Sequence, residues 1–196
     1  MLMQRRKMQA KNVNPNKGGK GLSHPIKFDE VGMASEKGQR FTDRNILGKS
    51  NLTSRITGFN VFIDRELQVI AGVQCVYDHK KKGGEYVRKD RDTREKQYQE
   101  ESFVCGEKEF IKSISGTLNG EDKLESINVI SSSNRAQRFG EPQTARKSFI
   151  LEIAPDEMPV CVFGSLLNFK EPGKKEHSII EHFGVEINRE KGVKKS

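Results

Sequence analysis

A six-residue hydrophobic pattern recurs along this 196-residue chain, and it constrains the fold more than any single residue does. The pattern is apolar, two free positions, apolar, one free position, apolar. Its clearest copies begin at Ile56, Leu124 and Ile180, and weaker copies begin at Ile70 and Ile111. The last positions of each copy alternate with period two, as in a strand with one buried face. The copies therefore predict a sheet architecture built by repetition, with related hairpins closing around one core.

Further strand signals and the absence of any long amphipathic helical pattern extend this to an all-β prediction. Turn residues such as Asn119-Gly120 and Pro155-Asp156 separate the strand signals. Residues 31–53 have no clear period and are expected to form a long loop. Strands are expected at 26–29, 55–64, 68–77, 102–105, 110–118, 124–131, 148–153, 159–167 and 179–187.

The composition fits one domain with extensions, because 33% of the residues are apolar and 32% are charged. No apolar run approaches the ~20 residues that a membrane-spanning helix needs, and the Met-Leu-Met start lacks the apolar region of a signal peptide. We therefore expect a cytoplasmic protein. Cys75 and Cys161 lie in apolar strand patterns and are expected to be buried thiols, with no disulfide framework and no zinc spacing.

The net charge of +8 is concentrated at the two ends of the chain. Residues 1–28 carry seven basic side chains and no acidic one, and residues 188–196 carry four basic and one acidic. The ends therefore hold +10, which leaves about −2 for residues 29–187. We divide the chain into a basic flexible arm (1–24), a β-domain (25–187) and a basic tail (188–196). Within the β-domain, the charged run at 79–101 has no apolar stripe to dock and is interpreted as a protruding, solvated insertion.

A basic arm favours an acidic partner, although a tail that only aids solubility is an equal alternative. Microtubules expose acidic tails, so a cytoskeletal or ciliary location is a reasonable hypothesis. Nucleic acid is disfavoured, because the arm has no aromatic side chain on which a base can stack. The candidate partner-binding residues of the arm are Arg5, Arg6, Lys7, Lys11, Lys17 and Lys20.

The chain shows no constellation that indicates catalysis. Its four histidines have no metal-ligand spacing, and no local signature of a nucleophile with its base is present. The Gly18–Gly21 segment lacks the strand-then-helix context and the ending of a phosphate loop. We predict no enzymatic activity, no metal and no cofactor.

Several segments resemble the jacalin-related lectins. The resemblance implies a β-prism of three four-stranded Greek-key sheets around a pseudo-threefold axis. It covers about residues 18–187 without the charged insertion. The matching segments are Gly18–Gly21 with Ile26–Asp29 (the glycine-rich opening and first strand), Ile56–Val61 with Ile70–Tyr77 (a first long hairpin), Phe110–Gly116 with Leu124–Val129 (a middle hairpin), Arg138–Gly140 after it, and Ile179–Val185 (the closing strand).

The resemblance also implies where a sugar site would lie. In these lectins the glycine-rich opening, loop amides and an aspartate four residues after a glycine hold sugar hydroxyls. The equivalent positions here are Gly19 in the opening and His177, Ser178, Ile179 and Glu181 before the last strand. His177 stands at the glycine position and Glu181 at the aspartate position.

Both altered residues change the chemistry that such a site needs. The extra methylene of glutamate moves its oxygens by about 1.5 Å, a large error for paired hydroxyl contacts. Histidine places a Cβ where glycine allows close approach. We therefore interpret Glu181 as a surface carboxylate at a strand start and His177 as a residue of a long charged loop over 168–176.

Two functions follow. The first is a non-enzymatic binding module, a protein–protein interaction component of a large intracellular assembly, whose sugar loop has decayed. The alternative is a lectin for mannose- or glucose-type glycans that tolerates Glu181 in place of aspartate.

Overall fold

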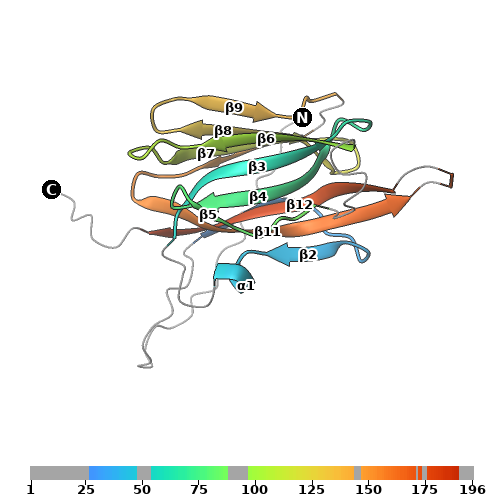
Figure 1. The fold of residues 1–196 in the computed structure, drawn as a ribbon, viewed down its shortest axis with the longest axis horizontal. Helices are drawn as coiled ribbons and strands as arrows, with labels where there is room; N and C mark the ends of the chain where they lie inside the picture. The colour runs from blue at the N-terminus through green and yellow to red at the C-terminus, as the bar shows by residue number, and fades with distance from the viewer. Residues whose placement is uncertain are drawn as a thin grey trace.

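The computed structural model describes residues 27–47, 54–87, 97–143, 147–170, 172–173 and 176–189. These residues form one short helix and β-strands (Figure 1). No described helix is long and apolar enough to cross a membrane. The elements are β1 (Lys27–Gly32), β2 (Gln39–Thr42), α1 (Arg44–Leu47), β3 (Ile56–Asp64), β4 (Ile70–Tyr77), β5 (Lys81–Lys82), β6 (Tyr98–Val104), β7 (Ile111–Leu118), β8 (Leu124–Ser131), β9 (Ala136–Phe139), β10 (Lys147–Glu152), β11 (Glu157–Lys170) and β12 (Glu176–Arg189).

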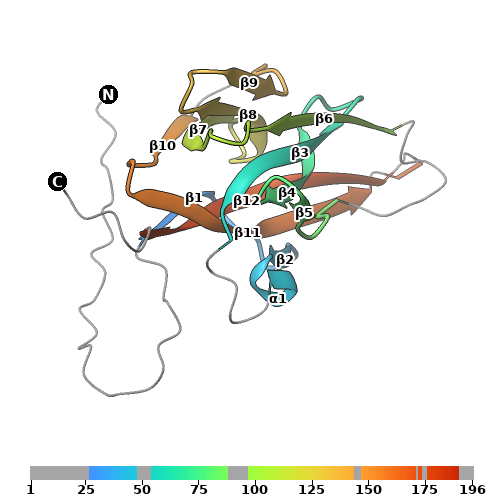
Figure 2. The same ribbon diagram turned by 60° about the vertical axis from the view of Figure 1, so that its left-hand side comes forward.

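The strands form three four-stranded sheets, which confirms the predicted prism (Figures 1 and 2). The strand orders are β5-β4-β3-β6, β10-β7-β8-β9 and β1-β12-β11-β2. In each sheet a long hairpin lies in the centre, and two shorter strands flank it in Greek-key order. The third sheet contains strands from both ends of the described chain, because β1 and β2 flank the β11–β12 hairpin. We call this third sheet sheet A.

The spacing of the recurring sequence pattern has a structural cause, which is a β-bulge. On each second hairpin strand one residue has no partner in the ladder, so the next inward residue comes three positions on instead of two. The residues left out of the pairing are Ala71 on β4, Glu125 on β8 and Glu181 on β12. The first hairpin strands carry a matching irregularity near their start. The five copies of the pattern thus mark five of six bulged strands related by pseudo-threefold symmetry, and the sixth is β11.

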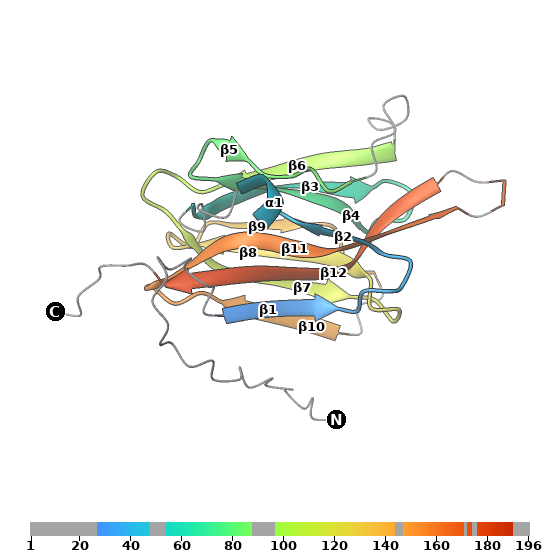
Figure 3. The same ribbon diagram turned by 90° about the horizontal axis from the view of Figure 1, so that it is seen from below.

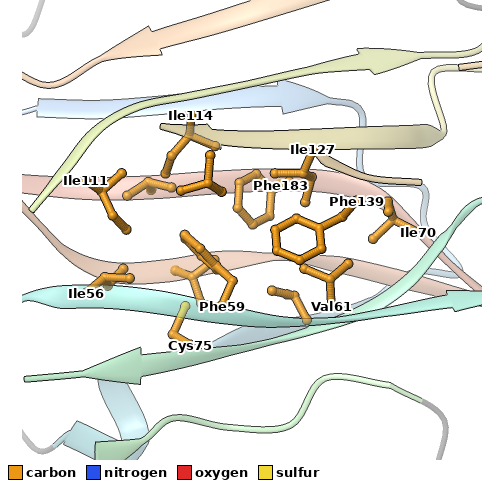
Figure 4. Packing of buried hydrophobic residues seen from close by; sticks show 14 of the residues in the cluster. Ile56, Phe59, Val61, Ile70, Cys75, Ile111, Ile114, Ile127, Phe139 and Phe183 are labelled. Carbon is orange, nitrogen blue, oxygen red and sulfur yellow. The ribbon is translucent and has the colours of Figure 1, made fainter. Parts of the chain in front are cut away.

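The core fills the space that the three sheets enclose (Figure 4). The inward residues of the predicted pattern meet there, among them Phe59 from β3, Ile127 from β8 and Phe183 from β12. All three cysteines, including Cys75 and Cys161, are buried free thiols, as predicted for those two. Burial of this kind stabilises a domain by roughly 25 cal/mol per Å² of apolar surface.

Some of the sequence-based assignments are wrong. The expected loop at 31–53 contains β2 and α1, and β9 lies in a segment to which no strand was assigned. The charged run at 79–101 is not wholly exposed to solvent in its described part. Val87 and Tyr98 are buried with Phe62 of β3 and Ala71 of β4 in a cluster separate from the main core, and Gln97 is buried as well. The strands also run further than expected: β11 continues to Lys170 and β12 begins at Glu176, so their hairpin projects beyond the other strands (Figure 3).

An ion pair ties the β8–β9 turn to the segment before β7. Arg135 Nη2 donates to Glu109 Oε2 at 2.6 Å and to the Val104 carbonyl at 2.9 Å. The hydrogen bonds from Arg135, from Ser133 and from the Gly106 amide lower the pKa of Glu109 to about 2.

This pKa predicts a pH dependence of stability. Because the folded pKa of Glu109 lies below its ordinary value of 4.5, its contribution is present above about pH 4.5 and is lost as the pH falls towards 2. We expect the free energy of unfolding of Glu109→Gln to fall less steeply than that of the wild type over this interval. Urea unfolding at a series of pH values measures both slopes, and parallel curves would contradict the assignment.

Candidate functional site

Glu181 lies at the bulge of β12 and is not a surface carboxylate at a strand start. Its side chain is only 6% exposed. Its backbone carbonyl accepts a hydrogen bond from Met33 N at 3.1 Å, and a Cβ on Gly32 would lie 2.1 Å from the same oxygen. Gly32 also has a φ of +82°, so the turn that leaves β1 requires glycine at this position. The bulge and this turn bring the loop 33–38 over Glu181.

The chain's own groups occupy one oxygen of the Glu181 carboxylate. Oε1 accepts from Ser35 N at 2.8 Å, from Ser35 Oγ at 3.1 Å and from Ser165 Oγ at 3.1 Å. A Cβ on Gly38 would lie 1.9 Å from Oε1, so a larger residue there would have to displace the carboxylate. Ser35 thus presents an amide and a hydroxyl to the carboxylate, much as two neighbouring hydroxyls of a sugar would. Loop 33–38 therefore holds this carboxylate within the fold.

His177 is also placed differently from the expectation, because it is buried in β12 and does not lie in a loop. It is 3% exposed. Its Nδ1–H donates to Asp64 Oδ2 at 2.8 Å, and its ring stacks on Phe169 with centroids 5.6 Å apart. Ser178 and Ile179, the other two family-equivalent positions, are buried in the same strand. The four residues 177–179 and 181 share β12, but none of them forms an open sugar loop.

The other predicted contact residues lie outside the described part of the chain. These are Gly19 of the expected glycine-rich opening and the basic residues of the arm, Arg5, Arg6, Lys7, Lys11, Lys17 and Lys20. Among the described residues, the loop that approaches Glu181 is 33–38, which follows β1. The assignment of Gly18–Gly21 to this role stays a prediction. The described residues contain no group of three His, Cys, Asp or Glu side chains able to hold a metal ion.

An open groove of about 1260 Å³ lies around β2. The outer face of sheet A forms one side of it, and the segment 85–87 forms the other. The lining residues are Glu30, Gly32, Met33, Ala34, Gln39, Arg40, Phe41, Thr42, Asn45, Ile46, Glu85, Tyr86, Val87, Phe163, Gly164, Leu166, Asn168 and His182.

An aromatic platform lies on the outer side of this groove. Phe163 on β11 pairs with Gly184 on β12, and a Cβ on Gly184 would lie 2.3 Å from the Phe163 ring. The tip of the ring therefore lies over the glycine, and the half-buried Phe163 lines the groove. His182 stands edge-on to the ring at 5.8 Å, and its Nε2–H donates to Glu30 Oε2 at 3.2 Å. An apolar surface and polar groups thus stand side by side.

The sequence carries a signal for this platform. Phe163-Gly164 and Phe183-Gly184 are two Phe-Gly dipeptides on neighbouring antiparallel strands, and each phenylalanine pairs with the other strand's glycine. One ring consequently packs into the core and the other lies on the outer face. A phenylalanine packed over a cross-strand glycine is a known stabilising pair, so the two dipeptides predict the arrangement once the register is known.

On the other side of β2, a buried carboxylate fixes a second aromatic residue. Asp43 is fully buried and accepts from Tyr77 Oη at 2.6 Å, from Tyr86 Oη at 2.7 Å and from Gly84 N at 2.8 Å. Burial, together with the hydrogen bond to Asp43, raises the pKa of Tyr86, so its hydroxyl stays a donor at neutral pH. The ring of Tyr86 stacks on Phe41 with centroids 4.3 Å apart.

Comparison with known proteins agrees with this geometry. Residues 29–165 match the family model of the jacalin-like lectin domain, a range that ends before β12. A search of curated proteins found no match. Among solved structures, a prostate-specific WGA16 glycoprotein lectin is 19% identical with a TM-score of 0.56, covering 82% of this chain and 99% of that one.

Two plant lectins are similar at lower identity. A mannose-specific jacalin-related lectin from Morus nigra, solved in complex with mannose, is 15% identical with a TM-score of 0.57, covering 88% of this chain and 99% of that one. A Malaysian banana lectin is 12% identical with a TM-score of 0.57, covering 85% of this chain and 100% of that one. At these identities the likeness extends to the fold.

Proposed function

Because the chain belongs to the jacalin-like lectin domain family, we propose that it is a non-enzymatic carbohydrate-binding protein whose sugar site is the groove around β2. The observation that carries the proposal is the Phe163 platform beside Glu30, His182 and Arg40. Sugars present an apolar C–H face and a ring of hydroxyls, and a site for them combines an aromatic surface with a few fixed polar groups. The groove offers both.

The carboxylate of Glu181 has a different role in this proposal. Its Oε1 is committed to Ser35 and Ser165, so Glu181 orders loop 33–38 at the rim of the groove and is not itself the main sugar contact. The mannose complex of the Morus nigra lectin makes mannose-type glycans the first ligands to test. Glucose-type glycans, which the sequence-based alternative names with them, are tested beside them.

A glycan array with four variants tests the site. We expect Phe163→Ala to weaken binding roughly tenfold, because about 50–60 Å² of sugar C–H surface loses its partner at about 25 cal/mol per Å². Arg40→Ala should also weaken binding. Arg138→Ala is the matched control, an exposed arginine on the short strand β9 of another sheet, and should bind like the wild type. Glu181→Gln keeps an oxygen for Ser35 and should change binding less than about twofold.

Two results would sink the proposal. A blank array for the wild-type protein would remove carbohydrate binding. Binding that is lost in Glu181→Gln but unaffected by Phe163→Ala and Arg40→Ala would move the site from the groove to the family-equivalent position. Circular dichroism and unfolding midpoints of all variants show whether each one is folded.

The interaction-module hypothesis finds no support in the fold or in the comparisons, which favour the lectin alternative. Binding of the basic arm to microtubules, and a cytoplasmic location with it, stay predictions. Cosedimentation of the full chain with microtubules at low and raised salt tests the first, because an electrostatic contact weakens as salt screens it.

A further inference from the structure

The groove extends to both sides of β2, as the register of the sheet establishes. Thr42 pairs with Phe163 and therefore lies on the outer face of sheet A. Phe41 pairs with Gly164 and lies on the opposite face, where it meets Tyr86. Residues from both faces line the same groove. A ligand that fills the groove must therefore pass over the edge of β2.

The edge of β2 offers main-chain hydrogen-bonding groups at this crossing. Asp43 N donates to the Val162 carbonyl at 3.1 Å, and in an antiparallel ladder alternate residues point their N–H and C=O groups to opposite sides. The main-chain groups of Thr42 and Arg40 consequently point away from β11, and β2 has no second neighbour among the described strands of its sheet. Two donors and two acceptors thus face the middle of the groove.

The inner side of the groove ends in a second apolar surface. Its two residues, Tyr86 and Ile46, both pack against Gly84: a Cβ there would lie 2.4 Å from the hydroxyl end of Tyr86 and 2.6 Å from Ile46 Cδ1. Tyr86 is fixed by Asp43, and Ile46 on α1 is 48% exposed although it is a large apolar residue. This surface is therefore held in place by Asp43 and α1. It lies on the opposite side of β2 from the Phe163 platform.

We infer that the groove takes an oligosaccharide of at least two sugar units, which crosses β2 with one unit on Phe163 and the next against Ile46 and Tyr86. This rests on the proposed function and names the ligand class for the same site. The size of the groove supports it, because about 1260 Å³ exceeds the roughly 300–1,000 Å³ of a site for one small molecule. The free main-chain groups of Arg40 and Thr42 supply hydrogen bonds for the linkage between the two units.

Titration with mannose, mannobiose and mannotriose tests the inference on the full-length protein. We expect the wild type to bind mannotriose at least tenfold more tightly than mannose. Ile46→Ser should reduce the affinity for mannotriose about fivefold and leave that for mannose unchanged. Ile150→Ser is the matched control, a 60% exposed isoleucine on the edge strand β10 of another sheet, and should alter neither affinity.

The outcomes separate this inference from the proposed function. Equal affinities for mannose and mannotriose, with binding still lost in Phe163→Ala, would overturn the second subsite and leave the sugar site standing. An Ile46→Ser variant that weakens mannose and mannotriose by the same factor would also overturn it. Absence of binding to all three sugars and to the glycan array would remove both proposals together.

Discussion

Replacement of Asp43 by alanine should lower the free energy of unfolding by about 4 kcal/mol or more. Asp43 is fully buried, and it accepts hydrogen bonds from two tyrosine hydroxyls and from Gly84 N. Alanine would leave two buried donors, Tyr77 Oη and Gly84 N, and the part-buried Tyr86 Oη without this acceptor, and each loss of a buried donor's partner costs about 1–3 kcal/mol. For a domain of this size the melting temperature would fall by roughly 2–4 °C for each kcal/mol.

Urea unfolding followed by circular dichroism measures this effect. Asp43→Asn is the conservative comparison. Its amide oxygen can still accept a hydrogen bond from one hydroxyl, but its NH₂ group cannot accept one from the remaining donors. We expect an intermediate loss for it. A decrease below about 1 kcal/mol in Asp43→Ala would show that the three donors find other partners and that Asp43 does not fasten the segment 83–87 to β2 and α1.

Asp64→Ala should be the second most damaging change among the polar residues discussed, with an expected loss of about 3 kcal/mol. The carboxylate is fully buried at the end of β3. Oδ1 accepts from Glu66 N and Leu67 N at 2.9 and 3.0 Å, which orders the β3–β4 turn. Oδ2 accepts from His177 Nδ1 at 2.8 Å, which connects that turn to the β11–β12 hairpin.

A double-mutant cycle separates the two roles of Asp64. Asp64→Ala, His177→Ala and the double variant are compared by equilibrium unfolding. We expect a coupling energy between the two side chains of about 1–3 kcal/mol, since they are in direct contact and buried. Additive losses would mean that the contact between Asp64 and His177 does not hold the hairpin. The effect of Asp64 would then come from its own turn and from Gln97, whose Nε2 also donates to Oδ2 at 3.3 Å.

The hairpins of the prism were predictable from the sequence because local physics determines them. The spacing from Ile180 to Phe183 to Val185 records a bulge followed by alternation, and the same spacing recurs on the other hairpin strands. β2 is not predicted from the sequence because a strand of four residues, of which only Phe41 is buried, has too short an alternation of apolar and polar residues to be recognised. Its position depends on pairing with β11, more than 120 residues away.

The candidate site was harder to predict, because its residues interact across large sequence separations. Ser35 and Glu181 are 146 residues apart, and no local pattern indicates that a loop after β1 closes on a bulge of β12. The same holds for His177 and Asp64, 113 residues apart. The residue types at 177 and 181 predict an altered sugar motif, and this stays a prediction. The consequence, a carboxylate held by the chain's own serine, needed the three-dimensional arrangement.

The choice of strands that form sheet A also has a consequence for the order in which the parts of the chain fold during synthesis. β1 and β2 leave the ribosome before the other described strands, yet their neighbours in the sheet, β12 and β11, are made after all of them. The other two sheets each consist of consecutive strands and are able to pair as they emerge. Closing a loop of about 150 residues costs roughly 4 kcal/mol of chain entropy, which must be met before the late contacts form. We therefore expect the last step of folding to be the docking of the earliest strands onto the latest hairpin, after translation has passed β12.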